Sequence, residues 1–172
     1  MKYCSECGEK LILKEVEHEG VIPYCKNCQK LIFPTFNVAV SLIALSPDEK
    51  HILLIQQYGK QRNILVAGYV NQKENVEETI LREMQEEIGR KVIQHRFLKS
   101  SYFAKSNTLM LNFVVKLDDD SLQDVSDWEV DHAAWYSFEE ASQAIAQGSL
   151  AQQFLLNFFA VYKQLDGHIF IV

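Results

Sequence analysis

One charged segment constrains the fold of this chain more than any other feature: residues 68–89 read GYVNQKENVEETILREMQEEIG. Between Asn75 and Ile88 the apolar residues recur at helical spacing, which predicts an amphipathic helix. The apolar positions of this helix are Val76, Ile80, Leu81, Met84 and Ile88. The segment starts at Gly68 and ends at Gly89, so a glycine bounds the helix and its preceding loop on each side.

The charged residues of this helix predict a cation site. Glu83 and Glu87 are four residues apart and Glu86 is three from Glu83, so all three carboxylates can lie along one edge. Clustered carboxylates repel one another unless a cation lies among them, and hard oxygen ligands suit Mg²⁺ or Mn²⁺. Arg82 lies four residues before Glu86, so its guanidinium can orient or screen one carboxylate. The alternative is a solvated acidic helix face, which explains most charge runs.

The whole segment resembles the Nudix box, whose pattern is Gly, five residues, Glu, seven residues, Arg-Glu, apolar, any, Glu-Glu, any, Gly, apolar. The matching positions are Gly68, Glu74, Arg82, Glu83, Met84, Glu86, Glu87 and Gly89. Arg90 departs from the pattern because it replaces the final apolar residue, and Asn71 and Lys73 depart from the commoner loop. The resemblance implies a Nudix α/β/α sandwich with a mixed sheet and hydrolysis of a phosphoanhydride bond.

All four cysteines lie in the first 28 residues, as Cys4-x-x-Cys7 and Cys25-x-x-Cys28. Two such pairs at this separation predict a four-thiolate zinc site in a zinc ribbon. The zinc would be structural, because four protein ligands close its coordination sphere and replace a hydrophobic core that so small a module cannot build. Disulfides or bound iron are the alternatives.

The bulk composition limits the classes of protein to consider. A chain of 172 residues that is 48% hydrophobic can form one packed domain and a small appendage, which we place at 35–172 and 1–34. The net charge of −6 argues against extended binding to a phosphate backbone. The apolar runs are strand-sized and the N-terminus has no signal-peptide pattern, so we expect a cytoplasmic protein without membrane spans.

Patterns along the rest of the chain predict an α/β fold. The expected strands cover residues 36–45, 51–57, 63–69, 92–103, 109–117, a segment ending at 136, and 167–172. Helices are expected at 138–146 and 149–163. The second helix is rich in aromatic residues, which would pack against the sheet or form a dimer contact. Strands that alternate with helices and hairpins predict an α/β sandwich with a mixed sheet.

A zinc ribbon directly before a Nudix box resembles the NADH pyrophosphatase-like branch of the superfamily. Residues 31–34, 67–70, 129–136 and 149–151 also resemble segments of that branch. The resemblance implies a homodimer that uses Mg²⁺ or Mn²⁺ to cleave NADH into NMNH and AMP. It assigns metal binding to Glu83, Glu86, Glu87 and the Ala67 carbonyl, catalysis to Glu86, Glu87 and Arg82, and substrate contacts to Phe33, Tyr69, Phe103 and Ala151.

The departures from that branch concern the substrate. Ser100–Ser106 reads SSYFAKS where the branch has Ser-Gln-Pro-Trp-Pro-Phe-Pro, and a glutamate that assists metal binding there aligns with Lys116. ADP-ribose, FAD or a nucleotide-sugar therefore remain alternatives to NADH. Removal of an NAD cap from RNA is a further alternative, although extended nucleic-acid binding is not expected. A nucleotide-sensing module without turnover is the alternative outside the enzymes.

Overall fold

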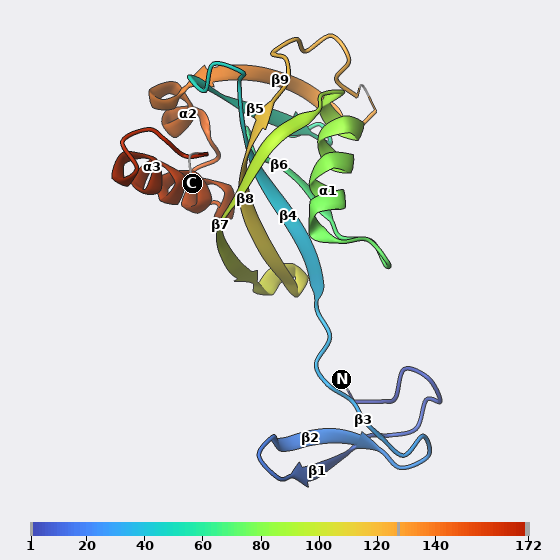
Figure 1. Cartoon of the computed structure of the whole chain (residues 1–172). Helices are drawn as coiled ribbons and strands as arrows, with labels where there is room; N and C mark the ends of the chain where they lie inside the picture. The colour runs from blue at the N-terminus through green and yellow to red at the C-terminus, as the bar shows by residue number, and fades with distance from the viewer. Residues whose placement is uncertain (1, 127, 171–172) are drawn as a thin grey trace. The chain divides into compact units, whose positions relative to one another are not determined.

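The computed structural model describes residues 2–126 and 128–170, and the chain forms two compact units, Met1–Phe36 and Asn37–Val172 (Figure 1). The first unit is a small antiparallel sheet in the order β1-β2-β3, formed by β1 (Ile12–Val16), β2 (Gly20–Cys25) and β3 (Lys30–Leu31). Its buried hydrophobic residues are few among those described, namely Cys4, Ile22 and Cys25. So small a core cannot hold a sheet together without a cross-link.

The second unit is built on a six-stranded mixed sheet. Five strands follow the order β7-β8-β4-β5-β9, and β6 pairs with β4 beside β5. The β4–β8 pair is parallel and the other pairs are antiparallel. The strands are β4 (Asn37–Leu45), β5 (His51–Gln57), β6 (Val66–Tyr69), β7 (Val92–Phe103), β8 (Thr108–Leu117) and β9 (Val130–Ser137).

Helix α1 (Val76–Glu83) begins and ends at residues suited to those positions. The side chain of Asn75 accepts a hydrogen bond from the Glu78 backbone N–H at 2.9 Å, and the Glu78 carboxylate accepts one from the Asn75 N–H at 3.0 Å. This capping box satisfies two N–H groups that a helix start otherwise leaves free. The helix then widens into a π-helical turn, Met84–Ile88, and ends at Gly89, whose φ of 72° favours glycine.

Helices cover both faces of the sheet. Figure 1 shows α1 on one face and α2 (Phe138–Ala144) and α3 (Leu150–Gln164) on the other. This is the α/β/α sandwich with a mixed sheet that the sequence predicts. No helix in the described part of the chain combines the length and the apolar character needed to span a membrane.

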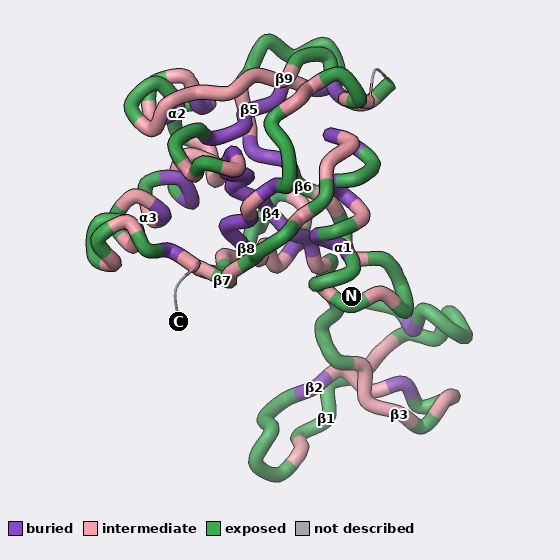
Figure 2. The backbone as a smooth tube through the Cα atoms, turned by 45° about the horizontal axis from the view of Figure 1, so that its top comes forward, coloured by how far each residue is buried: buried purple, intermediate pink, exposed green. Residues whose placement is uncertain are grey.

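Each face of the sheet has its own hydrophobic core. Ile80, Met84 and Ile88 of the helical segment pack against one face, and Phe154 and Phe158 of α3 pack against the other. The central strands β4 and β5 are buried along most of their length, which Figure 2 shows in purple. Strands covered on both faces read as continuous apolar runs, which is why these two were visible in the sequence.

The predicted elements agree with the structure except at the C-terminus and at the start of β6. The expected terminal strand at 167–172 is wrong for its described residues, Gly167–Phe170, which form turns. Gly167 has a φ of 81° and its N–H donates to the Tyr162 carbonyl at 3.0 Å, so it closes the end of α3. Residues 171–172 lie outside the described part. The expected strand at 63–69 is also shorter, because its regular pairing begins at Val66.

The packing of α3 predicts a strong effect of truncating Phe158. Its ring is fully buried and lies 5.6 Å from the Phe138 ring and 5.5 Å from the Tyr162 ring. Phe158→Ala should lower the free energy of unfolding by about 3–5 kcal/mol, measured by chemical denaturation. Leu156→Ala on the same helix, at a side chain 53% exposed, should change it by no more than about 0.5 kcal/mol. An equal loss in both variants would contradict the assignment of the buried face.

Candidate active site

A close contact between β6 and α1 defines the site. A Cβ atom built on Gly68 would lie 1.8 Å from both Cδ and Oε1 of Glu83, so the carboxylate lies directly over the glycine. No real Cβ approaches another atom so closely, so any other residue at position 68 would displace the Glu83 carboxylate. The absence of one side chain lets the helix carboxylate reach the backbone of the strand.

Arg82 connects the loop, the strand and the helix. Its Nε and Nη2 atoms donate to the two carboxylate oxygens of Glu74 at 2.7 and 3.1 Å. Nη1 donates to Glu83 at 2.7 Å and to Glu86 at 2.9 Å, and Nη2 also donates to the Tyr69 carbonyl at 3.0 Å. The Arg82 guanidinium lowers the pKa of Glu74 to about 2, with help from the Asn71 backbone N–H. The Glu74 carboxylate therefore fixes the position of the Arg82 guanidinium.

Glu87 is the buried carboxylate of the site. Its residue is 1% exposed, and its Oε2 atom has no hydrogen-bond partner. Burial, together with the charges of Glu83 and Glu129, raises the pKa of Glu87 to about 8. Burial also raises the pKa of Glu83, against the effect of Arg82. A buried carboxylate oxygen without a partner is costly, and a divalent cation beside it would remove that cost. The residues present therefore fit a divalent metal ion.

The three predicted carboxylates of the helix do not converge on one point. A compact metal site needs three or more His, Cys, Asp or Glu side chains whose ligand atoms lie close together, here within 4.8 Å of one another. Within residues 2–126 and 128–170 only the four cysteines form such a group, so the ligand atoms of Glu83, Glu86 and Glu87 lie further apart than this. Glu86, with a side chain 53% exposed, is held by Arg82, whereas Glu87 is buried. The structure thus brings Glu83 and Glu87 into the interior of the site and leaves Glu86 at its solvent side.

Glu129, immediately before β9, was not predicted as a site residue. The Tyr58 hydroxyl donates to its Oε1 at 2.9 Å, and Tyr58 itself has a φ of 57°, an uncommon conformation for a tyrosine. Sequence comparison instead aligned an assisting glutamate with Lys116, which forms an ion pair with Glu49 at 2.6 Å. The sequence signal that could have identified Glu129 was the resemblance of residues 129–136 to the NADH pyrophosphatase-like branch, because that segment begins with this glutamate.

A polar cavity of about 390 Å³ is lined by Arg82, Glu83 and Glu129, whereas Glu86 and Glu87 are not among its lining residues. Glu83 and Glu129 line it from opposite parts of the chain, and Arg82 contributes a positive charge. Its lining residues are Gln57, Tyr58, Ala67, Gly68, Tyr69, Asn71, Arg82, Glu83 and Glu129. Ala67, the predicted carbonyl ligand, is among them. A cavity with two carboxylates and a guanidinium can hold a cation together with an anionic group.

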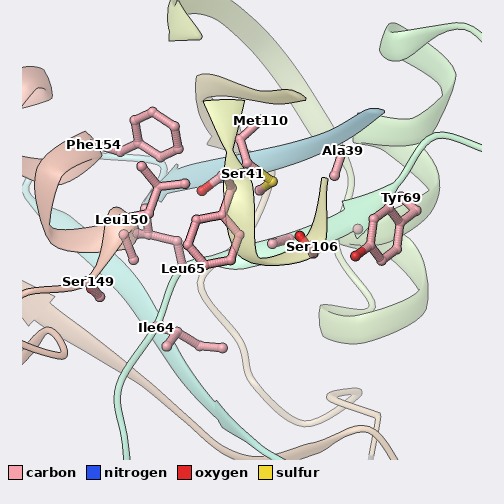
Figure 3. A pocket seen from close by; sticks show the side chains of 14 residues that line it. Ala39, Ser41, Ile64, Leu65, Tyr69, Ser106, Met110, Ser149, Leu150 and Phe154 are labelled. Atoms are coloured by element: carbon pink, nitrogen blue, oxygen red, sulfur yellow. The ribbon is translucent and has the colours of Figure 1, made fainter. Parts of the chain in front are cut away.

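A second, mostly apolar pocket of about 350 Å³ adjoins the same strand (Figure 3). It contains three of the residues predicted to contact substrate, Tyr69, Phe103 and Ala151. The side chains of Ala39, Ser41, Met110, Leu150 and Phe154 also line it. Aromatic and aliphatic walls of this size accept a planar ring. The fourth predicted contact, Phe33, belongs to the first unit, where its side chain is 53% exposed, and its role stays a prediction.

The four cysteines form a separate cluster in the first unit. The Sγ atoms of Cys4 and Cys28 lie 3.9 Å apart, and those of Cys7 and Cys25 lie 3.5 Å apart, so these pairs are free thiols. Four sulfur atoms at 2.3 Å from a tetrahedral zinc ion would be separated by about 3.8 Å. The arrangement therefore fits a closed four-thiolate site.

Two features together define the class of protein: the α/β/α sandwich, and the glutamate-rich helix that contacts Gly68 of β6. The family model described as NUDIX domain matches residues 35–158, and the chain belongs to that family. The match includes the whole segment from Gly68 to Gly89. It ends before the last turns of α3.

Curated relatives and solved structures extend this comparison. The NAD-capped RNA hydrolase NudC of Shigella flexneri is 26% identical over 157 residues, which cover 90% of this chain. NudC of Escherichia coli strain K12 / DH10B is 25% identical over the same length. The chain spans 58% of the length of both relatives.

Two solved structures share the fold. A NUDIX hydrolase from Nitrosomonas europaea has a TM-score of 0.67 and 21% identity, covering 96% of this chain and 93% of its own. The NUDIX domain of Shewanella oneidensis NrtR, solved with ADP ribose, has a TM-score of 0.61 and 17% identity, covering 83% and 94%.

The contact between Gly68 and Glu83 gives a direct test of the site. Gly68→Ala should displace the Glu83 carboxylate and weaken Mn²⁺ binding by roughly 10-fold or more, measured by electron paramagnetic resonance without substrate. Gln72→Ala, at an exposed position of the loop that follows β6, should leave Mn²⁺ affinity unchanged. Equal Mn²⁺ affinity in Gly68→Ala and the unmodified protein would show that Glu83 does not bind the cation from this position.

Proposed function

We propose that this chain is a divalent-metal-dependent pyrophosphohydrolase that cleaves the diphosphate of NADH, or of a similar nucleoside-diphosphate-linked compound. From NADH the products would be NMNH and AMP. One observation carries the proposal: Ala67, Gly68 and Tyr69 line both the carboxylate cavity and the apolar pocket. A molecule with a planar ring and a diphosphate could lie along this shared strip, with the ring in one cavity and the phosphates in the other.

The carboxylates would hold the cation. Glu83 and Glu87 supply buried oxygen atoms, Glu129 lines the same cavity as Glu83, and the Ala67 carbonyl is the fourth candidate ligand. Oxygen ligands of this kind suit Mg²⁺ or Mn²⁺. When bound, the cation would supply charge neutralisation at the diphosphate oxygens. The burial of Glu87 and its unpartnered Oε2 atom support this assignment.

Glu86 is the candidate general base. In the proposed step, a water oxygen forms a bond to one phosphorus, the bond from that phosphorus to the bridging oxygen breaks, and Glu86 accepts the water's proton. The side chain is accessible enough to reach a water molecule, and Arg82 holds its Oε2 at 2.9 Å. Arg82 thus orients the base, and the same guanidinium orients Glu83.

The apolar pocket would bind the ring of the substrate. Tyr69 and Phe103 provide aromatic faces, and Ala151 leaves space beside them. Stacking on an aromatic face suits nicotinamide and adenine equally. The preference for NADH therefore depends on the resemblance to the NADH pyrophosphatase-like branch, and ADP-ribose, FAD or a nucleotide-sugar could occupy the same two cavities.

Removal of an NAD cap from RNA is the second candidate function. It is favoured by the curated relatives, which carry that activity in their name. The net charge of −6 disfavours long contacts with an RNA backbone, but binding of the capped end requires few. A homodimer with Phe33 near the substrate remains part of the proposal, on the resemblance alone.

The four cysteines would bind one structural Zn²⁺ per chain. The gathering of their Sγ atoms supports this, as does the small number of buried apolar residues in the first unit. Zinc would supply the cross-link that this sheet requires. Its ligands belong to a different unit from the carboxylates, so the two metals have separate roles.

The deciding experiment measures products from a substrate panel with Mg²⁺ or Mn²⁺. The panel contains NADH, NAD⁺, ADP-ribose, FAD, nucleotide-sugars and NAD-capped RNA, and chromatography identifies the two phosphate products. We expect NADH to give NMNH and AMP, and Glu87→Gln to lower the rate at least about 100-fold, because it removes a negatively charged ligand. Glu77→Gln, an exposed glutamate of the same helix, should retain the rate.

The outcomes separate the alternatives. Turnover of another panel member alone would keep the mechanism and replace the substrate. Turnover of capped RNA in preference to free NADH would establish the second candidate. Binding of nucleotide without turnover of any member would exclude the enzyme and support a nucleotide-sensing module.

The zinc assignment predicts release of one zinc ion per chain when the thiols are blocked with a mercurial, measured with a colorimetric chelator. Cys25→Ser should purify with less than half of that zinc and with a less stable first unit, because it removes a fully buried ligand. Ser5→Ala, between the first two cysteines, should keep the full amount. An intact mass lower by the hydrogens of two disulfides, with no zinc, would contradict the assignment.

A further inference from the structure

Arg90 stands where the Nudix box has an apolar residue, and its side chain is directed to a loop and not to the core. The side chain is 13% exposed. Its Nε donates to the Ser121 carbonyl at 2.6 Å, and its Nη1 lies 2.9 Å from Oδ2 of Asp124. Both partners belong to the connection between β8 and β9. A single side chain thus ties the end of the glutamate-rich helix to a segment about 30 residues away in the sequence.

The same connection is held along the helix end by backbone contacts. The Ser126 N–H donates to the Glu87 carbonyl at 2.9 Å, and the Asp118 N–H donates to the Lys91 carbonyl at 3.0 Å. A Cβ atom on Gly89 would lie 2.6 Å from Cβ of Asp124, so the two segments are in close contact. The contact therefore runs directly beside the residues that would hold the cation.

Charge explains why an arginine is needed here. The connection contains several aspartates and has no lysine or arginine between Asp118 and Glu129. Arg90 lies 2.9 Å from Asp124 and 3.8 Å from Asp119, so it supplies the positive charge that this acidic segment lacks. An acidic segment without that charge would be repelled from the carboxylates of the neighbouring helix.

The connection ends at Glu129. The Val130 N–H donates to the Ser126 carbonyl at 3.0 Å, so the bond network that starts at Glu87 continues to the start of β9. The Tyr58 hydroxyl donates to the Glu129 carboxylate. The position of Glu129 relative to Glu83 and Glu87 is thus set by the pairing of Val130 with Gln57, by one aromatic hydroxyl and by the anchoring of this connection.

We propose that Arg90 is a positioning residue: it anchors the β8–β9 connection to the end of the catalytic helix and thereby sets the distance of Glu129 from Glu83 and Glu87. The inference rests on the proposed function, because it concerns the affinity of the same cation site. An apolar residue at position 90 could fill the space but could not bind the Ser121 carbonyl or the Asp124 carboxylate. Arg90 itself touches neither the cation nor the substrate.

The test compares Mn²⁺ affinity with stability in a set of full-length variants. Arg90→Leu restores the apolar residue of the motif, and Asp124→Asn removes the partner charge. Arg90→Lys keeps the positive charge but has one donor nitrogen in place of the two that bind Ser121 and Asp124. Glu49→Gln is the control, because it breaks the partly buried Lys116–Glu49 pair elsewhere in the same unit. Electron paramagnetic resonance gives the Kd for Mn²⁺ without substrate, and thermal denaturation with chelator gives stability.

Arg90→Leu is expected to raise the Kd for Mn²⁺ roughly 10-fold, as loss of an orienting partner does at other metal sites, with kcat at saturating Mn²⁺ largely retained. Asp124→Asn should give a smaller rise and Arg90→Lys a partial rescue. Glu129→Gln should raise the Kd as well, and adding Arg90→Leu to it should have little further effect, because both changes act through one carboxylate.

An unchanged Kd for Mn²⁺ in Arg90→Leu, with a lower thermal midpoint like that of Glu49→Gln, would overturn the inference and leave Arg90 a structural residue. Independent, multiplicative effects of Arg90→Leu and Glu129→Gln would overturn it as well. If the unmodified protein binds Mn²⁺ but hydrolyses no compound, the proposed function fails while the Kd values still decide the role of Arg90. If it binds no Mn²⁺ at all, both proposals are wrong.

Discussion

The site depends on one guanidinium that is shared among carboxylates. Glu74, Glu83 and Glu86 all accept hydrogen bonds from Arg82, and a fourth carboxylate, Glu87, is buried one helical turn further on. Without this positive charge, mutual repulsion would drive the side chains apart. With it, the loop before α1, the end of β6 and the helix keep a fixed relation, and the unpaired oxygen of Glu87 remains available to a ligand.

Local patterns made much of this arrangement predictable. The apolar periodicity from Val76 to Ile88 identified the helix. The spacing of Glu83, Glu86 and Glu87 predicted three carboxylates along one edge, but it did not show that only Glu83 and Glu87 are buried while Glu86 stays exposed. Glu129 was missed as a site residue because it reaches the cavity through the pairing of β9 with β5, a contact that no local pattern encodes. The terminal strand beginning at Gly167 was wrongly predicted for a related reason. A glycine before apolar residues is compatible both with a strand and with the end of a helix. In the structure Gly167 closes α3 and Ile169 is buried, a result that depends on contacts distant in sequence.

Strand β6 separates two chemically different spaces. Its residues pair with the buried strand β4, which fixes the backbone, while Ala67, Gly68 and Tyr69 line both a polar cavity and an apolar pocket. In the proposed function, the four residues of this strand would set how far a ring and a diphosphate can lie from each other. Replacement of the pocket side chains would then alter which ring is accepted without altering that distance.

The π-helical turn at Met84–Ile88 has a consequence for the evolution of the chain. A turn closed by i→i+5 hydrogen bonds contains one more residue than the α-helical turn it replaces. Deleting one residue there would close an ordinary α-helical turn and keep the residues that follow in phase, whereas inserting one more would rotate everything after it by about 100°. After such an insertion, Gly89 and Arg90 would face away from the β8–β9 connection. This stretch should therefore tolerate substitutions far better than insertions.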